Sequence, residues 1–294
     1  MEWTTFYGHM VTIGLSAFAD WRQADRDGID EGMETVHRLG GIAGLAHPFR
    51  IGSPACTGCF WEYEIGNWSA VDYIEVWSGT FPSIQTNNRR AFDLWTQKLN
   101  EGYRIAATSG RDWHGQGETD EPISVTYLGI EDDALAGKGD STAALSIHEA
   151  TLIQSLREGR ASVTLGPLLT LTLDAGGAVY AIGSTVPSVS GKRKVAEEPI
   201  RANLRVDFSV RAGLWSLTEQ ICRLKLYSNL GEELNLEVPY SSDGQTMQFE
   251  AQLGESAPDN PRRWLRAELW GIVRGFHVLI AFTNVIYFEE GGPQ

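Results

Sequence analysis

The spacing of apolar residues changes character near residue 165, and the two halves of the chain predict different structures. Before that point, short apolar runs alternate with stretches of helical periodicity, which is the pattern of a parallel sheet or barrel. Ser146 and Glu149 have the spacing of a helix N-cap and its partner. The predicted strands are 4–15, 42–46, 73–77, 105–108 and 124–130, and the predicted helices are 29–39, 83–101 and 144–159.

After residue 165 the segments are rich in β-branched residues, alternate between apolar and polar positions, and are separated by turn residues. This pattern is typical of antiparallel strands in a sandwich. The polar, turn-rich segment 188–199 predicts an exposed loop. We therefore expect a first domain over 1–164 and a β-rich domain over 165–294. The predicted strands of the second domain are 168–173, 202–210, 223–227, 247–253, 264–273 and 278–287.

Composition narrows the class of protein. With 294 residues, of which 42% are hydrophobic, the chain can bury a sizeable core. Its net charge of −14 argues against a nucleic-acid or anionic membrane partner. We expect a small-molecule substrate as the partner. Apolar runs fall far short of the roughly 20 residues that span a membrane. The N-terminus has no signal-peptide pattern, so we expect a cytoplasmic protein as the sequence is written.

Three cysteines make a disulfide framework improbable. Cys56 and Cys59 form a C-x-x-C pair, but no second pair or nearby histidine in the sequence completes a zinc knuckle. Metal binding and redox cycling by this pair remain open, although neither is the leading interpretation.

The strongest candidate chemistry follows the apolar runs. Asp112 and His114 are alternate residues just after the run 105–108, so their side chains are expected to point the same way. His47 ends another apolar run, and Glu2 and His9 open the chain beside the apolar run from Met10 to Leu15. Carboxylates and imidazoles at several strand ends are what a metal centre at the mouth of a barrel requires.

These motifs resemble a known family, the PHP (polymerase and histidinol phosphatase) metal-dependent hydrolases, and within it the carbaryl-hydrolase-like branch. The resemblance implies an α/β fold, with an incomplete (β/α) PHP-type barrel followed by a C-terminal antiparallel β-sandwich-like domain. It also implies that the metal ligands are Glu2, His9, His47, Asp112 and His114. The matching segments are Glu2 to His9, Ala46-His47-Pro48, Ile74 to Gly79, Gly110 to His114, Glu158-Gly159-Arg160 with Thr164 to Leu168, and Thr283 to Tyr287.

The first motif of that family, an H-x-H on the first barrel strand, has no counterpart here. Either the protein extends upstream of Met1, or a shortened barrel has lost part of its metal centre. Glu2, His9 and His47 would still form a three-ligand site with an open position for water. The metal positions that need the missing histidines would retain only Glu2 and Asp112 for one ion and His114 for another.

The expected activity is hydrolysis by metal-activated water of a phosphate ester, or of an amide, carbamate or ester. The expected catalytic residues are Asp112, His114 and Arg111. Arg111 would clamp an anionic substrate group, and its alternative role is a structural salt bridge. Nitrogen and oxygen ligands suit zinc, manganese or iron. The alternatives are a non-catalytic remnant that binds a carbohydrate or a protein, and a structural metal-binding module. The oligomeric state is open.

Overall fold

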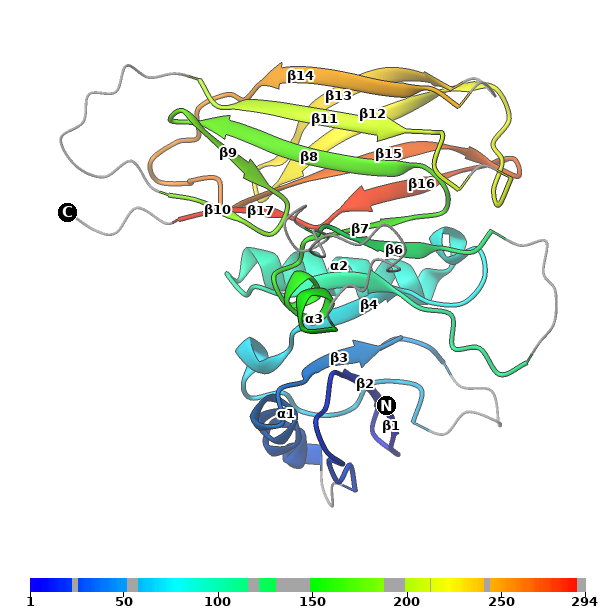
Figure 1. Cartoon of the computed structure of the whole chain (residues 1–294), viewed down its shortest axis with the longest axis vertical. Coiled ribbons are helices and arrows are strands. Elements are labelled where there is room, and N and C mark those ends of the chain that lie inside the picture. The colour runs from blue at the N-terminus through cyan, green and yellow to red at the C-terminus, as the bar shows by residue number, and fades with distance from the viewer. Residues whose placement is uncertain are drawn as a thin grey trace, which may run out of the picture. The chain divides into compact units, whose positions relative to one another are not determined.

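The computed structural model describes residues 1–22, 26–51, 58–115, 122–130, 149–187, 199–211, 213–240 and 244–289. The expected N-cap Ser146, residue Cys56 and nearly all of the expected loop 188–199 lie outside these ranges. The chain divides into two compact units (Figure 1). One unit comprises Met1–Gly115 and Leu128–Ala161, and the other comprises Gln116–Tyr127 and Ser162–Gln294.

The first unit is built on a five-stranded sheet in the order β1-β2-β3-β4-β5. β1 pairs antiparallel with β2, and β2 pairs antiparallel with β3, whereas β3, β4 and β5 run parallel. β3 and β4 are buried along their whole length, as expected for strands covered on both faces. The strands are β1 (Glu2–Thr4), β2 (His9–Ile13), β3 (Ile42–Ala46), β4 (Tyr73–Trp77) and β5 (Ala106–Ser109).

Helices cover this sheet because each has one apolar face. α1 contacts β3 through a face that includes the buried Met33 and Val36, and α2 contacts β4. Trp95 of α2 is buried, and its indole Nε1 donates to the carbonyl of Ile105 at 2.8 Å. The helical segments are η1 (Arg26–Gly28), α1 (Ile29–Arg38), η2 (Trp68–Ala70), η3 (Pro82–Ile84), α2 (Thr86–Asn100) and α3 (Glu149–Arg157).

The expectation of a (β/α) barrel is wrong. Within the part of the chain that the structure describes, the five-stranded sheet is open, with β1 at one edge and β5 at the other. A barrel of this type needs parallel neighbours throughout, but the first two pairings are antiparallel. In addition, β6 (Val125–Leu128) and β7 (Ala161–Thr164) join a different sheet, so they are not available to close the first one.

α3 completes the core of the first unit although it lies far along the chain. Leu156 belongs to a buried cluster with Ile42 and Tyr73, against which Ile153 packs. The left-handed backbone of Gly14, with φ of 76°, leaves room for Ile153, since a Cβ there would lie 2.2 Å from that side chain. The core of the first unit is therefore built from two stretches of chain, one before and one after the segment Gln116–Tyr127, which belongs to the second unit.

The second unit contains two sheets. One has four strands in the order β14-β11-β8-β9, and the other has eight, with the path β10-β17-β15-β16-β7-β6 and with β12 joining β15 to β13. β8 contacts both β15 and β16, so the two sheets pack face to face. The remaining strands are β8 (Leu168–Ala175), β9 (Ala178–Ala181), β10 (Thr185–Val186), β11 (Arg201–Asp207), β12 (Gln220–Ser228), β13 (Gly231–Tyr240), β14 (Thr246–Gln252), β15 (Trp264–Val273), β16 (Phe276–Thr283) and β17 (Ile286–Phe288).

Alternation explains how the second unit forms its core. In β8 the residues Leu169, Leu171 and Leu173 are buried while those between them are only partly covered. β11 and β12 follow the same period of two, which places one apolar face of each strand inward. None of the helices that the structure describes is long and apolar enough to cross a membrane.

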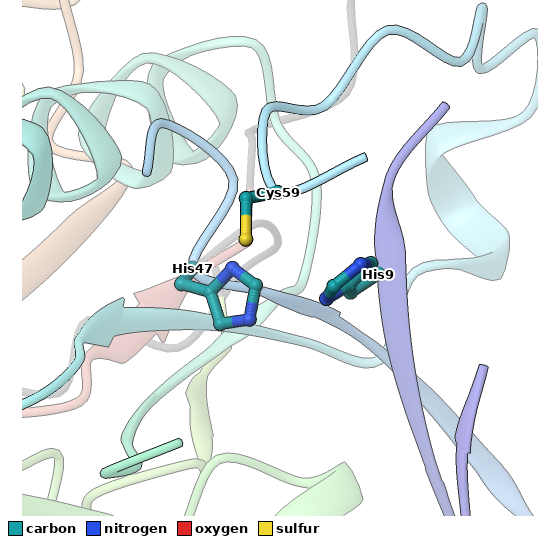
Figure 2. Close-up of side chains that lie close together, drawn as sticks. All are labelled: His9, His47 and Cys59. Carbon is teal, nitrogen blue, oxygen red and sulfur yellow. The ribbon is translucent and has the colours of Figure 1, made fainter. Parts of the chain in front are cut away.

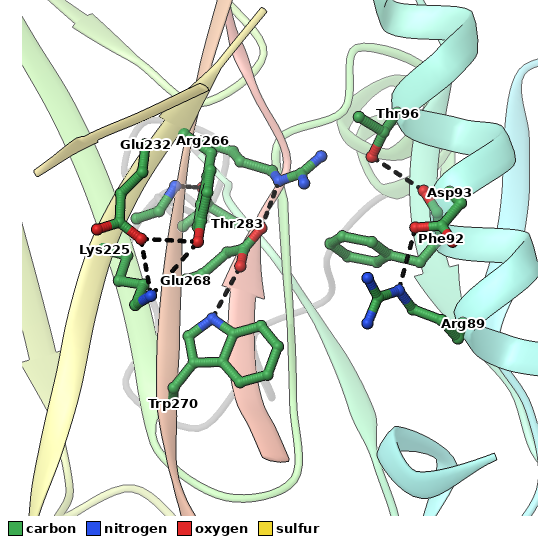
Figure 3. Close-up of polar contacts among 12 residues, drawn as sticks. Arg89, Phe92, Asp93, Thr96, Lys225, Glu232, Arg266, Glu268, Trp270 and Thr283 are labelled. Carbon is green, nitrogen blue, oxygen red and sulfur yellow. Dashed lines mark hydrogen bonds and ion pairs between the residues drawn. The ribbon is translucent and has the colours of Figure 1, made fainter. Parts of the chain in front are cut away.

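The larger sheet also buries a set of paired polar groups (Figure 3). Arg266 and Glu268 of β15 are 5% and 2% exposed, and the Arg266 guanidinium donates from Nε to a Glu268 carboxylate oxygen at 2.8 Å. The other Glu268 oxygen accepts from the indole of Trp270 at 2.8 Å. Both carboxylate oxygens are thus hydrogen-bonded, which offsets much of the cost of burying the charges.

Candidate metal centre

The candidate site is formed in the first unit, where the ends of β1, β2 and β3 converge. Glu2 begins β1 opposite Val11, and His9 begins β2 opposite Thr4. Alternate residues of a strand point to the same face, so the antiparallel pairing places the side chains of Glu2 and His9 on one face of the sheet. His47 follows the last residue of β3, which pairs with His9. The sheet register therefore brings together three residues that the sequence predicted as metal ligands.

The distances between these groups are short. A carboxylate oxygen of Glu2 lies 3.3 Å from Nδ1 of His9 and 3.8 Å from Nε2 of His47. The two imidazole rings meet edge to face, with their centroids 5.1 Å apart. Nitrogen and oxygen ligands of this kind suit a divalent transition metal ion.

His47 is the most informative member of the set. It is 2% exposed, and neither of its ring nitrogens has a hydrogen-bond partner among the described residues. Buried polar atoms without partners are rare in folded proteins and call for an explanation, such as an ion that they bind. Burial, reinforced by the charges of His9 and Arg50, lowers the pKa of His47 to about 4. The imidazole is therefore neutral near pH 7, which is the form that binds a metal.

Cys59 adjoins the two histidines. Its Sγ lies within 4.8 Å of a ring nitrogen of each, and Figure 2 shows the sulfur pointing toward His47. The cysteine is disulfide-bonded in this structure, so its sulfur can act as a thiolate ligand only after reduction. Sequence reasoning did not join Cys59 to the site, because the nearest histidines in space are far away along the chain.

Asp112 lies close to Glu2 and His47 but already forms ion pairs with other residues. One of its oxygens belongs to a second group of possible ligands, with Glu2 and His47, whose atoms lie within 4.8 Å of one another. Its two carboxylate oxygens also pair with Arg50 and with Nε2 of His114, the latter at 2.9 Å. Arg50 is a second residue that the sequence did not single out, since no motif connects it to Asp112.

His114 and Arg111 lie toward solvent. The side chain of His114 is 80% exposed and contacts Asp112, and it does not belong to either group of close ligand atoms. The guanidinium of Arg111 lies 4.4 Å from the ring centroid of Trp113, which is 62% exposed. This cation–π pair places a positive charge and an aromatic face at the surface near Asp112.

Two residues of the site have backbone conformations that favour glycine. φ is 32° at His47 and 50° at Asp112, each directly after or near the end of a parallel strand. Non-glycine residues rarely adopt positive φ, and when they do they cluster at functional positions.

Glu75 of β4 lies behind the site. It is 8% exposed, and burial together with the charge of Glu2 raises its pKa to about 7. Gly110 allows this close approach, because a Cβ there would lie 2.6 Å from the Glu75 carboxylate. A hydrogen bond from the backbone of His47 to the Glu75 carboxylate acts against this rise in pKa. Oε1 of Glu75 has no hydrogen-bond partner among the described residues, and the expectation that Glu75 orients the ring of a ligand histidine stays a prediction.

No family model matches the chain, and no curated protein matches it either.

Proposed function

We propose that the first unit binds one divalent transition metal ion through Glu2, His9 and His47, and that the protein is a metal-dependent hydrolase of a phosphate ester or of an amide, carbamate or ester. The observation that carries the proposal is the state of His47. Its two buried ring nitrogens have no hydrogen-bond partner among the described residues, and the ring lies beside the Glu2 carboxylate and the His9 imidazole. The resemblance of these segments to PHP hydrolases supports the same assignment. The fold gives no such support, because the sheet of the first unit is open, whereas that family has a barrel.

The residues present fit such an ion. Three donors leave a coordination position for water or substrate, and a bound divalent ion supplies a Lewis acid and lowers the pKa of water to about 7. Glu2 offers the negative charge that favours a cation. Burial keeps His47 neutral, so that a ring nitrogen can donate its lone pair to the ion. Arg111 and Trp113 offer a cation and an apolar face to a small-molecule substrate.

A second candidate function is metal binding without turnover. It is favoured by Asp112, because Arg50 and His114 occupy both of its carboxylate oxygens. A second ion would have to displace these partners, and without one the site could serve structure alone.

The test begins with metal content. The full chain, incubated with zinc, manganese or iron and then dialysed, should retain about one ion, which elemental analysis measures. His47→Ala should lose it, whereas His277→Ala, at an exposed position of β16, should retain it. No retained ion in the unaltered chain, or equal retention in His47→Ala, would overturn the site. Hydrolysis of para-nitrophenyl phosphate and para-nitrophenyl acetate by the loaded chain then separates the hydrolase from the structural module.

A further inference from the structure

The second unit contains a pocket that the metal chemistry does not use. Its volume is about 760 Å³, within the range typical of small-molecule sites. The lining comes from four parts of the unit: Pro122 and Ile123, the turn after β7, Arg211 with Gly213 to Thr218, and the region where β15 turns into β16. All of the lining residues belong to the second unit, so the pocket is defined within one compact body.

Most of the wall is apolar. Trp215 contributes an indole whose Nε1 donates to the carbonyl of Val210 at 2.8 Å, which fixes the ring. Gly166 lets the ring approach the backbone, since a Cβ there would lie 2.3 Å from the indole. Leu214 and Ile272 also line the pocket, yet they are 72% and 45% exposed. Exposed apolar side chains at the lip of a cavity indicate that an apolar body binds there.

The charges of the wall are all of one sign. Arg211 and Arg274 line the pocket, and the described lining contains no acidic residue. Nη1 of Arg211 is buried and has no hydrogen-bond partner among the described residues. The hydroxyl of Tyr127, a residue outside the pocket lining, is also buried without a hydrogen-bond partner among the described residues, and the charges of both Arg211 and Asp207 act on it. In a chain of net charge −14, a pocket lined by two arginines, one of which has an unsatisfied donor, favours an anion.

We propose that this pocket binds a small amphipathic anion, namely a carboxylate with an alkyl or aryl body, with its acid group on Arg211 and its apolar part along Trp215, Leu214 and Ile272. Nη1 of Arg211 has no hydrogen-bond partner among the described residues, and a carboxylate bound to this guanidinium would add charge-assisted hydrogen bonds. The apolar wall then selects for an attached hydrocarbon.

The experiment measures binding of octanoate to the full chain by titration calorimetry, with octanol and octylamine as probes of the same length. Octanoate should bind, and the neutral and cationic probes should bind at least tenfold more weakly. Arg211→Gln should weaken octanoate binding at least tenfold. Arg201→Gln is the matched control, because Arg201 is an exposed arginine of the same unit that pairs with Glu250 outside the pocket.

A second variant guards against loss of folding. Ile272→Asp alters a partly exposed position of the lip, and should weaken octanoate while the circular dichroism spectrum is unchanged. His47→Ala should bind octanoate normally, so a failure of the metal site does not affect this result. Absence of octanoate binding, equal binding of octanol, or equal affinities in the unaltered, Arg211→Gln and Ile272→Asp chains would overturn the proposal.

Discussion

The ring of Tyr73 lies directly against the backbone of Gly44, so closely that a Cβ on Gly44 would come within 2.1 Å of the ring. Gly44 is in the middle of β3, and Tyr73 begins the neighbouring strand β4. The Tyr73 hydroxyl continues past β3 and donates to the carbonyl of Val11 in β2 at 2.8 Å. One side chain thus links three strands, and the glycine makes its path possible.

We expect Gly44→Ala to lower the free energy of unfolding by about 2–3 kcal/mol, because overpacking of a filled core costs about that much. Urea denaturation of the full chain measures the change. Gly44→Ala combined with Tyr73→Leu should recover part of the loss, since the smaller side chain leaves room for the methyl group. A neutral single variant, or a double variant whose loss is the sum of the two separate losses, would contradict this packing.

Reduction should add a ligand to the metal site. With Cys59 in its disulfide, a bound cobalt(II) ion would have only nitrogen and oxygen ligands from Glu2, His9 and His47. After a thiol reductant is added, a sulfur-to-cobalt charge-transfer band should appear in the near ultraviolet. Cys59→Ser should bind cobalt without that band under both conditions. A reduced chain that binds cobalt but shows no band would place the sulfur outside the coordination sphere.

The buried pair Arg266 and Glu268 predicts a large penalty when one partner is removed. Glu268→Ala should destabilise the chain by about 3–5 kcal/mol, because it removes the carboxylate that pairs with the buried guanidinium of Arg266. Glu268→Gln should cost less, since the amide oxygen can still accept one hydrogen bond. Denaturation midpoints of the two variants test the order. The exposed pair Arg223 and Glu237 provides the control, and Glu237→Ala should change stability by less than about 1 kcal/mol.

Cys222 predicts a loss of stability in alkali. It is fully buried in β12, and burial raises its pKa from 9.0 to about 11. The stability that the protonated thiol contributes is fully present below pH 9 and is lost as the pH rises toward 11, because only the unfolded chain then ionises. The total is about 3 kcal/mol. The difference in unfolding free energy between the unaltered chain and Cys222→Ala should therefore shift in favour of the variant by that amount between pH 8 and pH 11. A constant difference would show that the thiol ionises equally in both states.

Local pattern was a good guide to individual strands and a poor guide to their partners. The apolar runs 42–46, 73–77 and 264–273 coincide with β3, β4 and β15. The rhythm of strand and helix, however, does not state the direction of pairing. β2 and β3 are antiparallel even though α1 lies between them. The predicted strand 4–15 is also wrong at its start, since β1 ends at Thr4 and β2 begins only at His9, where the chain has reversed direction. These two differences explain why the prediction of a barrel was wrong.

The site shows the same limit. Glu2, His9, His47 and Asp112 were found because each stands beside a strand end, and the register of the sheet brings them together. Cys59 and Arg50 come from the irregular segment after β3, where no periodicity indicates which way a side chain points. Their contacts with the histidines and with Asp112 depend on the path of that segment in space.

The interleaved order of the two units has a consequence for synthesis. Every strand of the five-stranded sheet is present once residue 109 has been made, but Ile153 and Leu156, which complete its core, follow the first segment of the other unit. Arg157 also reaches back to the carbonyl of Gly41 at 3.0 Å. A growing chain therefore carries the sheet with part of its apolar face uncovered until α3 leaves the ribosome. Shielding of that face by a chaperone during this interval would protect the nascent protein from aggregation.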